Sequence, residues 1–374
     1  MANNYPFVLI HGYNNMTDTF GPAREILTEA GYECYSPHIG PFTGLWDRAC
    51  ELYAMLKGGT VDYGIAHSER CGHPRYGKTF EGMFKNWGEL DENGERVKAH
   101  FVGHSFGGAT IRFLLHLLIE GDEREKAVTP ADELHPLFQG GHDDWIETVF
   151  TVAAPHNGTT VLTMAGGYIY TSYFMEFSKA NINSGTTKND ADKYDLDRFG
   201  FTSDKFRLRY APDKIRGYLK KKEDNCFYEL TPSGADRFTG DFQPYKNVYY
   251  FSVAAVGTQP ILGGEAQWPT DVLVERHRSS SIIMGSMHSK YYGPEWRPND
   301  GRVPLASALH PKNEPWQDFP DGYDYRGPVD KGIWNVFPVE EPKDHNFYIG
   351  EEVDPEVYKE YILKLGNFLA ALDK

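Results

Sequence analysis

The sequence predicts an α/β protein in which a mostly parallel central sheet carries helices on both faces. Apolar runs at residues 7–10, 99–102 and 148–154 are continuous rather than alternating, which is typical of parallel strands buried on both sides. Segments with helical spacing of apolar residues alternate with these runs, as in layered α/β proteins. A glycine-rich heptapeptide, residues 103–109, joins one run to a strongly helical segment, so a sharp strand-to-helix turn is expected there.

The individual elements follow from local patterns. Strands are expected where short apolar or β-branched runs are bounded by turn residues, at 7–10, 33–35, 99–102, 148–154 and 247–256. Helices are expected where apolar residues recur at helical spacing, at 23–30, 111–118, 163–177 and 357–372. Residues 42–96 and 161–245 depart from this alternation of strands and helices, and the first of these stretches is rich in glycine, histidine and aromatic residues. We therefore expect one domain over residues 1–374, with insertions at 42–96 and 161–245.

The composition excludes several classes of protein. The chain has 374 residues and a net charge of −15, and this acidic balance argues against a nucleic-acid partner because phosphate binding needs a basic surface. No apolar run is long enough to span a membrane. Residues 1–6 are too short to hold a secretion signal before the first strand, which leaves a cytoplasmic protein and a trimmed secreted one open. The four cysteines show no paired metal spacing and are expected to be buried free thiols.

Ser105 is the candidate nucleophile. It stands in Gly103-His104-Ser105-Phe106-Gly107, between an expected strand and an expected helix, and this context is typical of a nucleophile elbow, which exposes the serine Oγ on a tight turn. Glycines flank the serine because the chain packs closely there. The elbow narrows the fold class to the α/β-hydrolase arrangement, in which the serine, an acid and a histidine follow one another along the chain.

A serine hydroxyl needs a base to take its proton, and the base needs an acceptor to orient it. His345 is the preferred base because it lies shortly before the final amphipathic helix; the alternatives are His277, His288 and His310. Asp300 is the preferred acid because it lies on a loop between Ser105 and His345; the alternatives are Asp321 and Asp324. The oxyanion hole needs two backbone N–H groups, and these are expected from Tyr13, after the first strand, and from Phe106.

Beyond these residues, longer motifs resemble a known family. Trp46-Asp47-Arg48-Ala49-Cys50-Glu51, Gly58 to Gly64, His67 and Gly72-His73 are similar to the zinc-binding insertion of thermoalkalophilic bacterial lipases, the zinc-containing triacylglycerol lipases of Geobacillus and staphylococcal type. The similarity continues through residues 103–108, 154–160, 299–301 and 344–345.

The resemblance implies an α/β-hydrolase fold with a helical lid, for which 163–177 is the expected segment, and the triad Ser105, Asp300 and His345. It also implies a structural zinc ion held by Asp47, His67, His73 and a fourth ligand, an aspartate in the family, which falls here on Glu229. The family binds calcium near the catalytic histidine. Here Phe347 stands where the family has a glutamate, and Glu351, Glu352 and Asp354 are out of register, so calcium is left open.

The sequence therefore predicts a carboxylic ester hydrolase that works through an acyl-enzyme. The resemblance implies lipid or other hydrophobic esters as substrates, including polyesters, with transient contact to a lipid interface and a secreted location. Two alternatives remain: an acyltransferase or serine peptidase on the same scaffold, and a binding protein that has kept the hydrolase fold. The sequence leaves the oligomeric state open.

Overall fold

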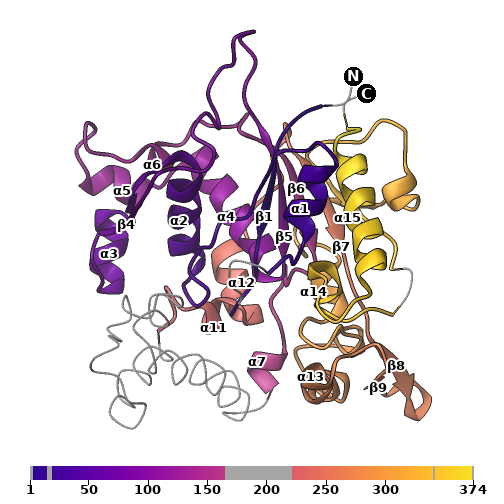
Figure 1. Ribbon diagram of the computed structural model, residues 1–374. Coiled ribbons are helices and arrows are strands. Elements are labelled where there is room, and N and C mark those ends of the chain that lie inside the picture. The colour runs from indigo at the N-terminus through magenta and orange to yellow at the C-terminus, as the bar shows by residue number, and fades with distance from the viewer. Residues whose placement is uncertain (1–2, 15–18, 165–220, 340–341, 373–374) are drawn as a thin grey trace, which may run out of the picture.

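The computed structural model describes residues 3–14, 19–164, 221–339 and 342–372 (Figure 1). The central sheet in this part of the chain consists of β1 (Phe7–Ile10), β2 (Cys34–Tyr35), β5 (Ala99–His104), β6 (Ile146–Val152), β7 (Tyr249–Val253), β10 (Trp316–Asp318) and β11 (Trp334–Val336). The spatial order is β10–β11–β7–β6–β5–β1–β2, and every neighbouring pair is parallel. Ser105 follows β5, near the middle of this sheet.

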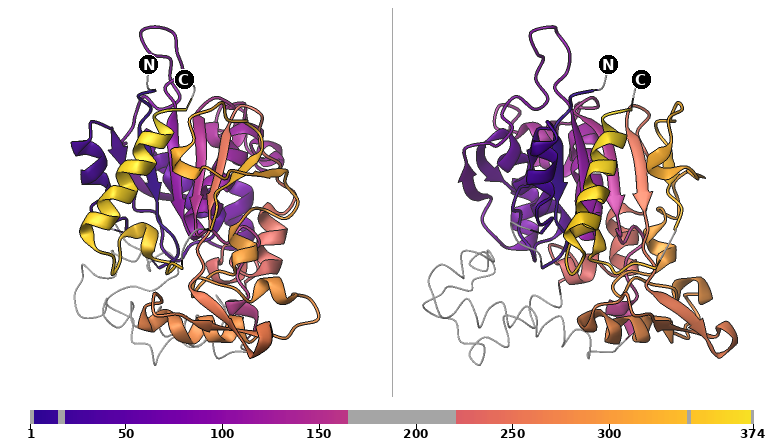
Figure 2. Two further views of the ribbon diagram at one scale, coloured as in Figure 1. Left: turned by 90° about the vertical axis from the view of Figure 1, so that its right-hand side faces the viewer. Right: turned by 45° about the vertical axis from the view of Figure 1, so that its right-hand side comes forward.

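Both faces of the sheet are buried. Along β1, Val8 and Ile10 belong to one hydrophobic cluster and Phe7 and Leu9 to the other, because successive strand residues point to opposite faces. The first cluster includes residues of α2 (Leu45–Lys57) and α4 (Phe106–Glu120), and the second includes residues of α1 (Ala23–Glu29) and α15 (Pro355–Leu369) (Figure 2). The prediction of an α/β fold with a parallel sheet covered on both sides is thus confirmed.

The remaining elements lie around this sheet. The helices are α3 (Ile65–Cys71), α5 (Glu123–Val128), α6 (Pro136–Gln139), α7 (Val161–Met164), α11 (Cys226–Glu229), α12 (Pro232–Thr239), α13 (Glu275–Gly285) and α14 (Leu305–Ala308). Two antiparallel pairs stand apart from the sheet: β3 (Gly59–Asp62) with β4 (Tyr76–Phe80), and β8 (Thr258–Ile261) with β9 (Ala266–Pro269). The 3-10 turns are η3 (Leu262–Gly264), η4 (Pro294–Trp296), η5 (Gly322–Asp324) and η6 (Phe347–Ile349).

The expected insertions have different outcomes. Residues 42–96 contain α2, β3, α3 and β4, and α2 packs directly on α4, so the start of this insertion is part of the scaffold. The expected lid helix at 163–177 lies outside the described residues except for the end of α7. The division into one domain with insertions at 42–96 and 161–245 stays a prediction.

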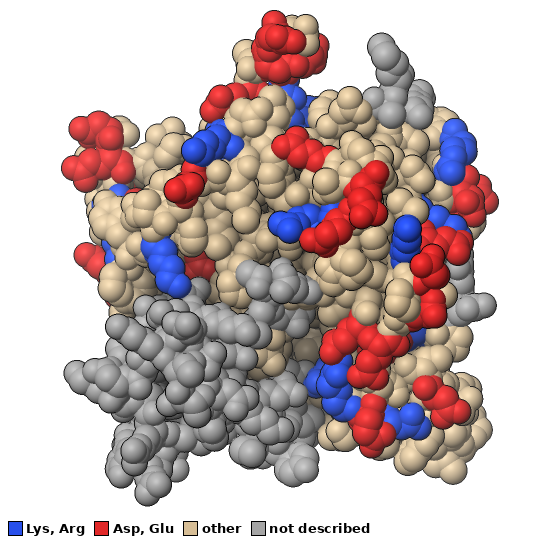
Figure 3. Space-filling model, in the orientation of Figure 1, with Lys and Arg blue, Asp and Glu red and all other residues tan. Residues whose placement is uncertain are grey.

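The surface agrees with the acidic composition. On the face shown in Figure 3, Asp and Glu are spread widely with Lys and Arg between them, and the described residues form no continuous basic patch there. Within the described ranges, no helix is both long and apolar enough to cross a membrane. The four cysteines are free thiols, and all but the partly exposed Cys34 are buried.

Candidate functional site

Ser105 occupies a strained turn between β5 and α4. Its backbone has φ 55° and ψ −128°, a region that residues other than glycine rarely adopt and that costs about 1–3 kcal/mol. The neighbouring glycines are required by close packing: a Cβ on Gly103 would lie 2.6 Å from the Gly108 nitrogen, and a Cβ on Gly107 would lie 2.2 Å from the Ile10 oxygen. These contacts explain why the turn carries glycine on both sides of the serine.

Asp300 and His345 are hydrogen-bonded to each other. The His345 Nδ1 lies 2.7 Å from Asp300 Oδ2, and the His345 backbone nitrogen donates to the Asp300 carbonyl at 3.0 Å. The other carboxylate oxygen, Oδ1, accepts from the backbone nitrogens of Arg302 at 2.8 Å and Val303 at 2.7 Å. Asp300 is completely buried, so both of its oxygens are fixed by partners within the protein.

Ser105 and His345 face the same cavity. It measures about 320 Å³ and is also lined by Tyr13, His277 and Arg276. The alternative acids Asp321 and Asp324 lie at η5, after β10, and the carboxylate bonded to His345 is that of Asp300. A cavity shared by a strained serine and a carboxylate-bound imidazole is what acyl transfer requires.

The alternative histidines have other partners. His277 bonds to Asp344, His288 contacts Arg297, and the His310 ring stacks on Trp316. The position of His345 beside Asp300 therefore agrees with the preferred base.

The loop after β1 lies against the serine. A Cβ on Gly12 would lie 2.7 Å from the Ser105 Cβ and 3.2 Å from its Oγ, so only glycine lets the chain approach so closely. Tyr13 follows at the cavity wall, and Phe106 starts α4, where backbone N–H groups are free of helical partners. These are the two positions from which the oxyanion donors are expected.

Arg48, part of the motif at residues 46–51, lies behind this loop and supports it. Its guanidinium donates to the carbonyls of His11 at 2.5 Å and Gly40 at 2.8 Å and to Thr110 Oγ1 at 2.8 Å, and it lies 5.2 Å from the Phe106 ring centroid. Burial lowers the pKa of Arg48 to about 10, so it stays a cation at neutral pH. The sequence carried no separate signal for this role, because α2 also contains Asp47, Glu51 and Lys57.

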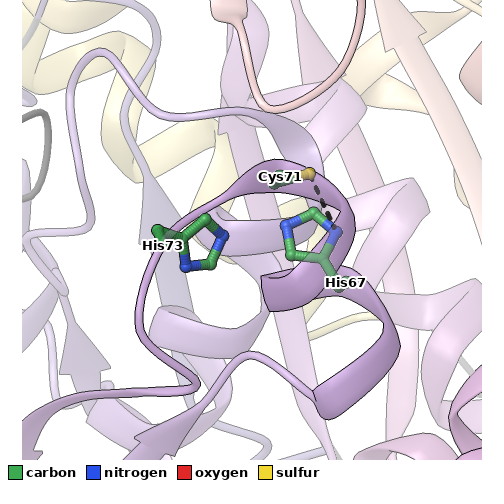
Figure 4. Close-up of side chains that lie close together, drawn as sticks. All are labelled: His67, Cys71 and His73. Carbon is green, nitrogen blue, oxygen red and sulfur yellow. Dashed lines mark hydrogen bonds between the residues drawn. The ribbon is translucent and has the colours of Figure 1, made fainter.

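A group of possible metal ligands lies between α2, α3 and the segment before α11. His67 Nε2 is 3.1 Å from Asp47 Oδ1, and His73 Nε2 is 3.8 Å from the same oxygen and 4.0 Å from Asp224 Oδ2. Ligand atoms of Asp47, His67 and Asp224 all lie within 4.8 Å of one another. Figure 4 shows the two imidazoles side by side, with Cys71 bonded to the Nδ1 edge of His67.

The donor set fits a metal ion. His73 Nδ1 lies 2.9 Å from the Pro74 carbonyl, which can only accept, so Nδ1 carries the proton and Nε2 turns a lone pair toward Asp47 and Asp224. The His67 ring stacks on Trp46 at 4.8 Å, which fixes its plane. Two imidazoles and two carboxylates at this spacing are a typical four-coordinate zinc donor set.

Glu229 does not join this group, which corrects the predicted ligand set. Its Oε2 accepts from the Leu45 nitrogen at 2.6 Å and its Oε1 from the Asn225 nitrogen at 3.2 Å. The carboxylate thus satisfies a free N–H at the start of α2, and burial raises its pKa to about 7. The carboxylate beside the histidines is Asp224, five residues earlier. Its backbone has φ 50° just before α11, which local sequence patterns did not reveal.

Known proteins are similar to this chain over nearly its whole length. A family model described as "Lipase-like, C-terminal domain" matches residues 3–372. Lipase 1 of Staphylococcus aureus is 34% identical over 368 residues, which cover 94% of this chain and 51% of that protein. The chain therefore spans about half the length of the staphylococcal lipases that it matches by sequence.

Two solved structures are similar over nearly the whole chain. The lipase of Staphylococcus hyicus has a TM-score of 0.84 at 30% identity and covers 98% of this chain and 96% of its own. EstA of Clostridium botulinum has a TM-score of 0.81 at 30% identity and covers 100% of this chain and 88% of its own.

Proposed function

Since the chain belongs to the lipase-like family whose model spans residues 3–372, we propose that it is a carboxylic ester hydrolase. The observation that carries this proposal is a strained Ser105 that shares a cavity with His345, which is itself bonded to the buried Asp300. The relatives that are named as lipases are consistent with this reaction.

The proposed mechanism follows from the partners of each atom. His345 Nδ1 donates to Asp300, which leaves Nε2 unprotonated and able to take the Ser105 proton as Oγ attacks the ester carbonyl. The backbone N–H groups of Tyr13 and Phe106 would stabilise the oxyanion. The leaving alkoxide takes the proton back from Nε2 as the carbon–oxygen bond breaks. Water, deprotonated by His345, then attacks the acyl-enzyme and releases the acid and Ser105.

We also propose that Asp47, His67, His73 and Asp224 hold a zinc ion. The ion would supply a structural cross-link between α2, α3 and the segment that leads into α11, and no catalytic step runs through it. The support is the geometry of the donor set and the tautomer of His73. Because zinc links elements far apart in the chain, its removal should lower stability rather than alter the reaction.

The substrates proposed are lipid or other hydrophobic esters, with polyester hydrolysis and contact with a lipid interface as further expectations from the resemblance. The secreted location is likewise a proposal. The acyltransferase, peptidase and binding alternatives have no observation in their favour beyond the shared scaffold.

The test is a series of p-nitrophenyl esters of increasing acyl length, assayed with the wild type and Ser105→Ala, together with labelling by a phosphonate probe. Hydrolysis and labelling that both disappear in Ser105→Ala are expected. An added alcohol and a matched amide substrate separate hydrolysis from transfer and peptide cleavage. Folded wild type that neither hydrolyses esters nor reacts with the phosphonate would refute the proposal.

A further inference from the structure

Asp344, directly before the catalytic histidine, is bonded to α13 and the loop before it. His277 Nδ1 lies 3.0 Å from Asp344 Oδ1 and 2.9 Å from Oδ2, the Asn346 nitrogen donates to Oδ1 at 2.9 Å, and the Val274 nitrogen donates to Oδ2 at 3.1 Å. Both carboxylate oxygens therefore accept from donors within the protein, and the single His277 Nδ1–H lies between them. Asp344 therefore ties the loop that carries His345 to the start of α13.

The neighbouring residue on α13 holds the next part of the same loop. Arg276 pairs with Glu351 at 2.5 Å and with Glu352 at 3.2 Å. These pairs are partly exposed and contribute little individually. The His277–Asp344 pair is buried, with side chains 2% and 7% exposed, so it carries most of the attachment.

α13 also contacts the loop of the catalytic acid. Ser280 Oγ donates to the Gly301 carbonyl at 2.5 Å, and a Cβ on Gly301 would lie 2.7 Å from the His277 Cβ. The His277 and His345 ring centroids are 6.3 Å apart. One helix therefore touches both loops whose relative position sets the hydrogen bond between Asp300 and His345.

The protonation of the buried pair suits this role. Burial lowers the pKa of His277, and the bond to Asp344 offsets this only in part. Burial by itself raises the pKa of Asp344, but the hydrogen bond from His277 and those from two backbone nitrogens outweigh it, and the net effect lowers that pKa. At neutral pH a neutral imidazole thus donates its Nδ1–H to an ionised carboxylate.

The calcium ion that the family resemblance implies near the histidine does not fit these residues. Both oxygens of Asp344 accept hydrogen bonds from the protein, and Glu351 and Glu352 are paired with Arg276. Phe347 lies against Tyr361 and the Lys343 ammonium group. Calcium sites in proteins are built around carboxylates, and the three carboxylates of Asp344, Glu351 and Glu352 already have hydrogen-bond or ion-pair partners.

We propose that His277, assisted by Arg276, is a positioning residue that holds the His345 loop in register with Asp300 without a divalent cation. The inference rests on the proposed ester hydrolysis. It gives two side chains of α13 a role beside the catalytic histidine, where the resemblance implies calcium. It follows that the activity of this chain does not depend on calcium.

Three variants test the role of His277. His277→Leu removes the donor, His277→Asn keeps an N–H near the position of Nδ1, and Arg278→Ala is the matched control, since Arg278 sits on the same helix but contacts Asp271 and the carbonyls of residues 270 and 273. A small displacement of a catalytic group is costly, so kcat in His277→Leu should fall by at least about tenfold with KM within about twofold. His277→Asn should recover most of the loss, and Arg278→Ala should match the wild type.

Two results with the His277 variants would contradict the proposed positioning role. A His277→Leu variant with wild-type kcat, or a His277→Asn variant as impaired as His277→Leu, would show that the hydrogen bond does not position His345. Calcium provides a measurement that does not depend on any variant folding. Zinc-loaded wild type in calcium-depleted buffer should change neither kcat nor melting temperature when calcium is added, whereas a bound ion would raise the melting temperature, and such a rise overturns the proposal.

Failure of the underlying function would look different. If Ser105→Ala hydrolyses esters as fast as the wild type, the catalytic assignment is wrong and the positioning role is overturned with it. If Ser105→Ala is inactive while His277→Leu is unimpaired, the inference about α13 fails alone.

Discussion

The substitution Asp300→Asn should abolish catalysis while leaving the fold intact. Asp300 Oδ1 accepts two backbone N–H groups, at 2.8 and 2.7 Å, and Oδ2 faces His345 Nδ1 at 2.7 Å. An asparagine must keep its carbonyl oxygen toward the two backbone donors. Its NH₂ group then faces Nδ1, which must accept rather than donate, so the proton moves to Nε2. In that tautomer His345 cannot take the proton of Ser105.

The expected loss of kcat is large because the substitution places the proton of His345 on the wrong ring nitrogen, and does not merely remove one hydrogen bond. The same exchange in a Ser-His-Asp triad lowers kcat by about 10⁴-fold, which corresponds to about 5 kcal/mol of activation free energy. Stability should change little, since the asparagine has nearly the same shape and keeps both backbone hydrogen bonds. The free energy of unfolding therefore separates this variant from one that merely disrupts the loop.

The assay is kcat and KM for p-nitrophenyl butyrate, with thermal unfolding measured in parallel. Asp321→Asn and Asp324→Asn are the matched controls, because these residues were the alternative acids and lie at η5. Both should retain wild-type kcat. An Asp300→Asn variant within tenfold of wild-type kcat, or an η5 variant that loses activity instead, would refute the assignment of the acid.

Three further predictions concern the metal, the oxyanion loop and acid stability. Asp224→Ala should lose bound zinc, and a chelator should lower the melting temperature of the wild type by roughly 2–3 °C, the shift that about 2 kcal/mol produces in a chain of this length. Arg48→Lys replaces the planar guanidinium that bridges the His11 and Gly40 carbonyls behind the oxyanion loop, and it should lower kcat by about tenfold to hundredfold with little change in KM. Burial lowers the pKa of His104 to about 3. Between about pH 6.5 and 3, His104 is therefore protonated in the unfolded chain but neutral in the folded chain. The free energy of unfolding then falls as the pH falls, by up to about 1.4 kcal/mol per pH unit. In His104→Gln, the free energy of unfolding should fall less steeply over this pH range.

Each of these has a control and a contrary result. Glu229→Gln should keep its zinc, measured by elemental analysis, because Glu229 bonds to backbone nitrogens rather than to the metal group; zinc lost from Glu229→Gln but kept in Asp224→Ala would reverse the assignment. Arg48→Lys with unchanged kcat would remove the proposed bracing role. An acid unfolding curve identical in the wild type and His104→Gln would show that His104 does not titrate on unfolding.

The elements that the sequence predicted well are those set by local interactions. The strand of residues 7–10 was predicted with its bounds, because a short continuous apolar run that ends in a tight turn is typical of a parallel strand buried on both faces. The turn at Ser105 was predicted for a similar reason, since its two glycines are dictated by atoms within a few residues and by one neighbouring strand. Family resemblance then added Asp47, His67 and His73, which the structure brings together.

Two features of the site were not predicted correctly from the sequence, and both depend on contacts between residues far apart in the chain. Glu229 and Asp224 are both carboxylates in one short segment, and only the path of the chain into α11 decides which of them faces the histidines. The sequence identifies Arg48 only as a charged residue of the motif at residues 46–51. Its carbonyl partners lie in the loops at residues 11 and 40, which only the folded chain brings to the guanidinium group.

By itself the sequence determined the layered fold, the serine elbow and the chemical types of its partners, because apolar periodicity and glycine placement act over a few residues. Only the tertiary structure decided which carboxylates reach which imidazoles. Asp300 with His345, Asp344 with His277, and Asp224 with His73 each join segments separated by between 45 and 151 positions. The physical reason is that a hydrogen bond depends on the position of two atoms within a fraction of an ångström, and such positions are set by packing of the whole chain.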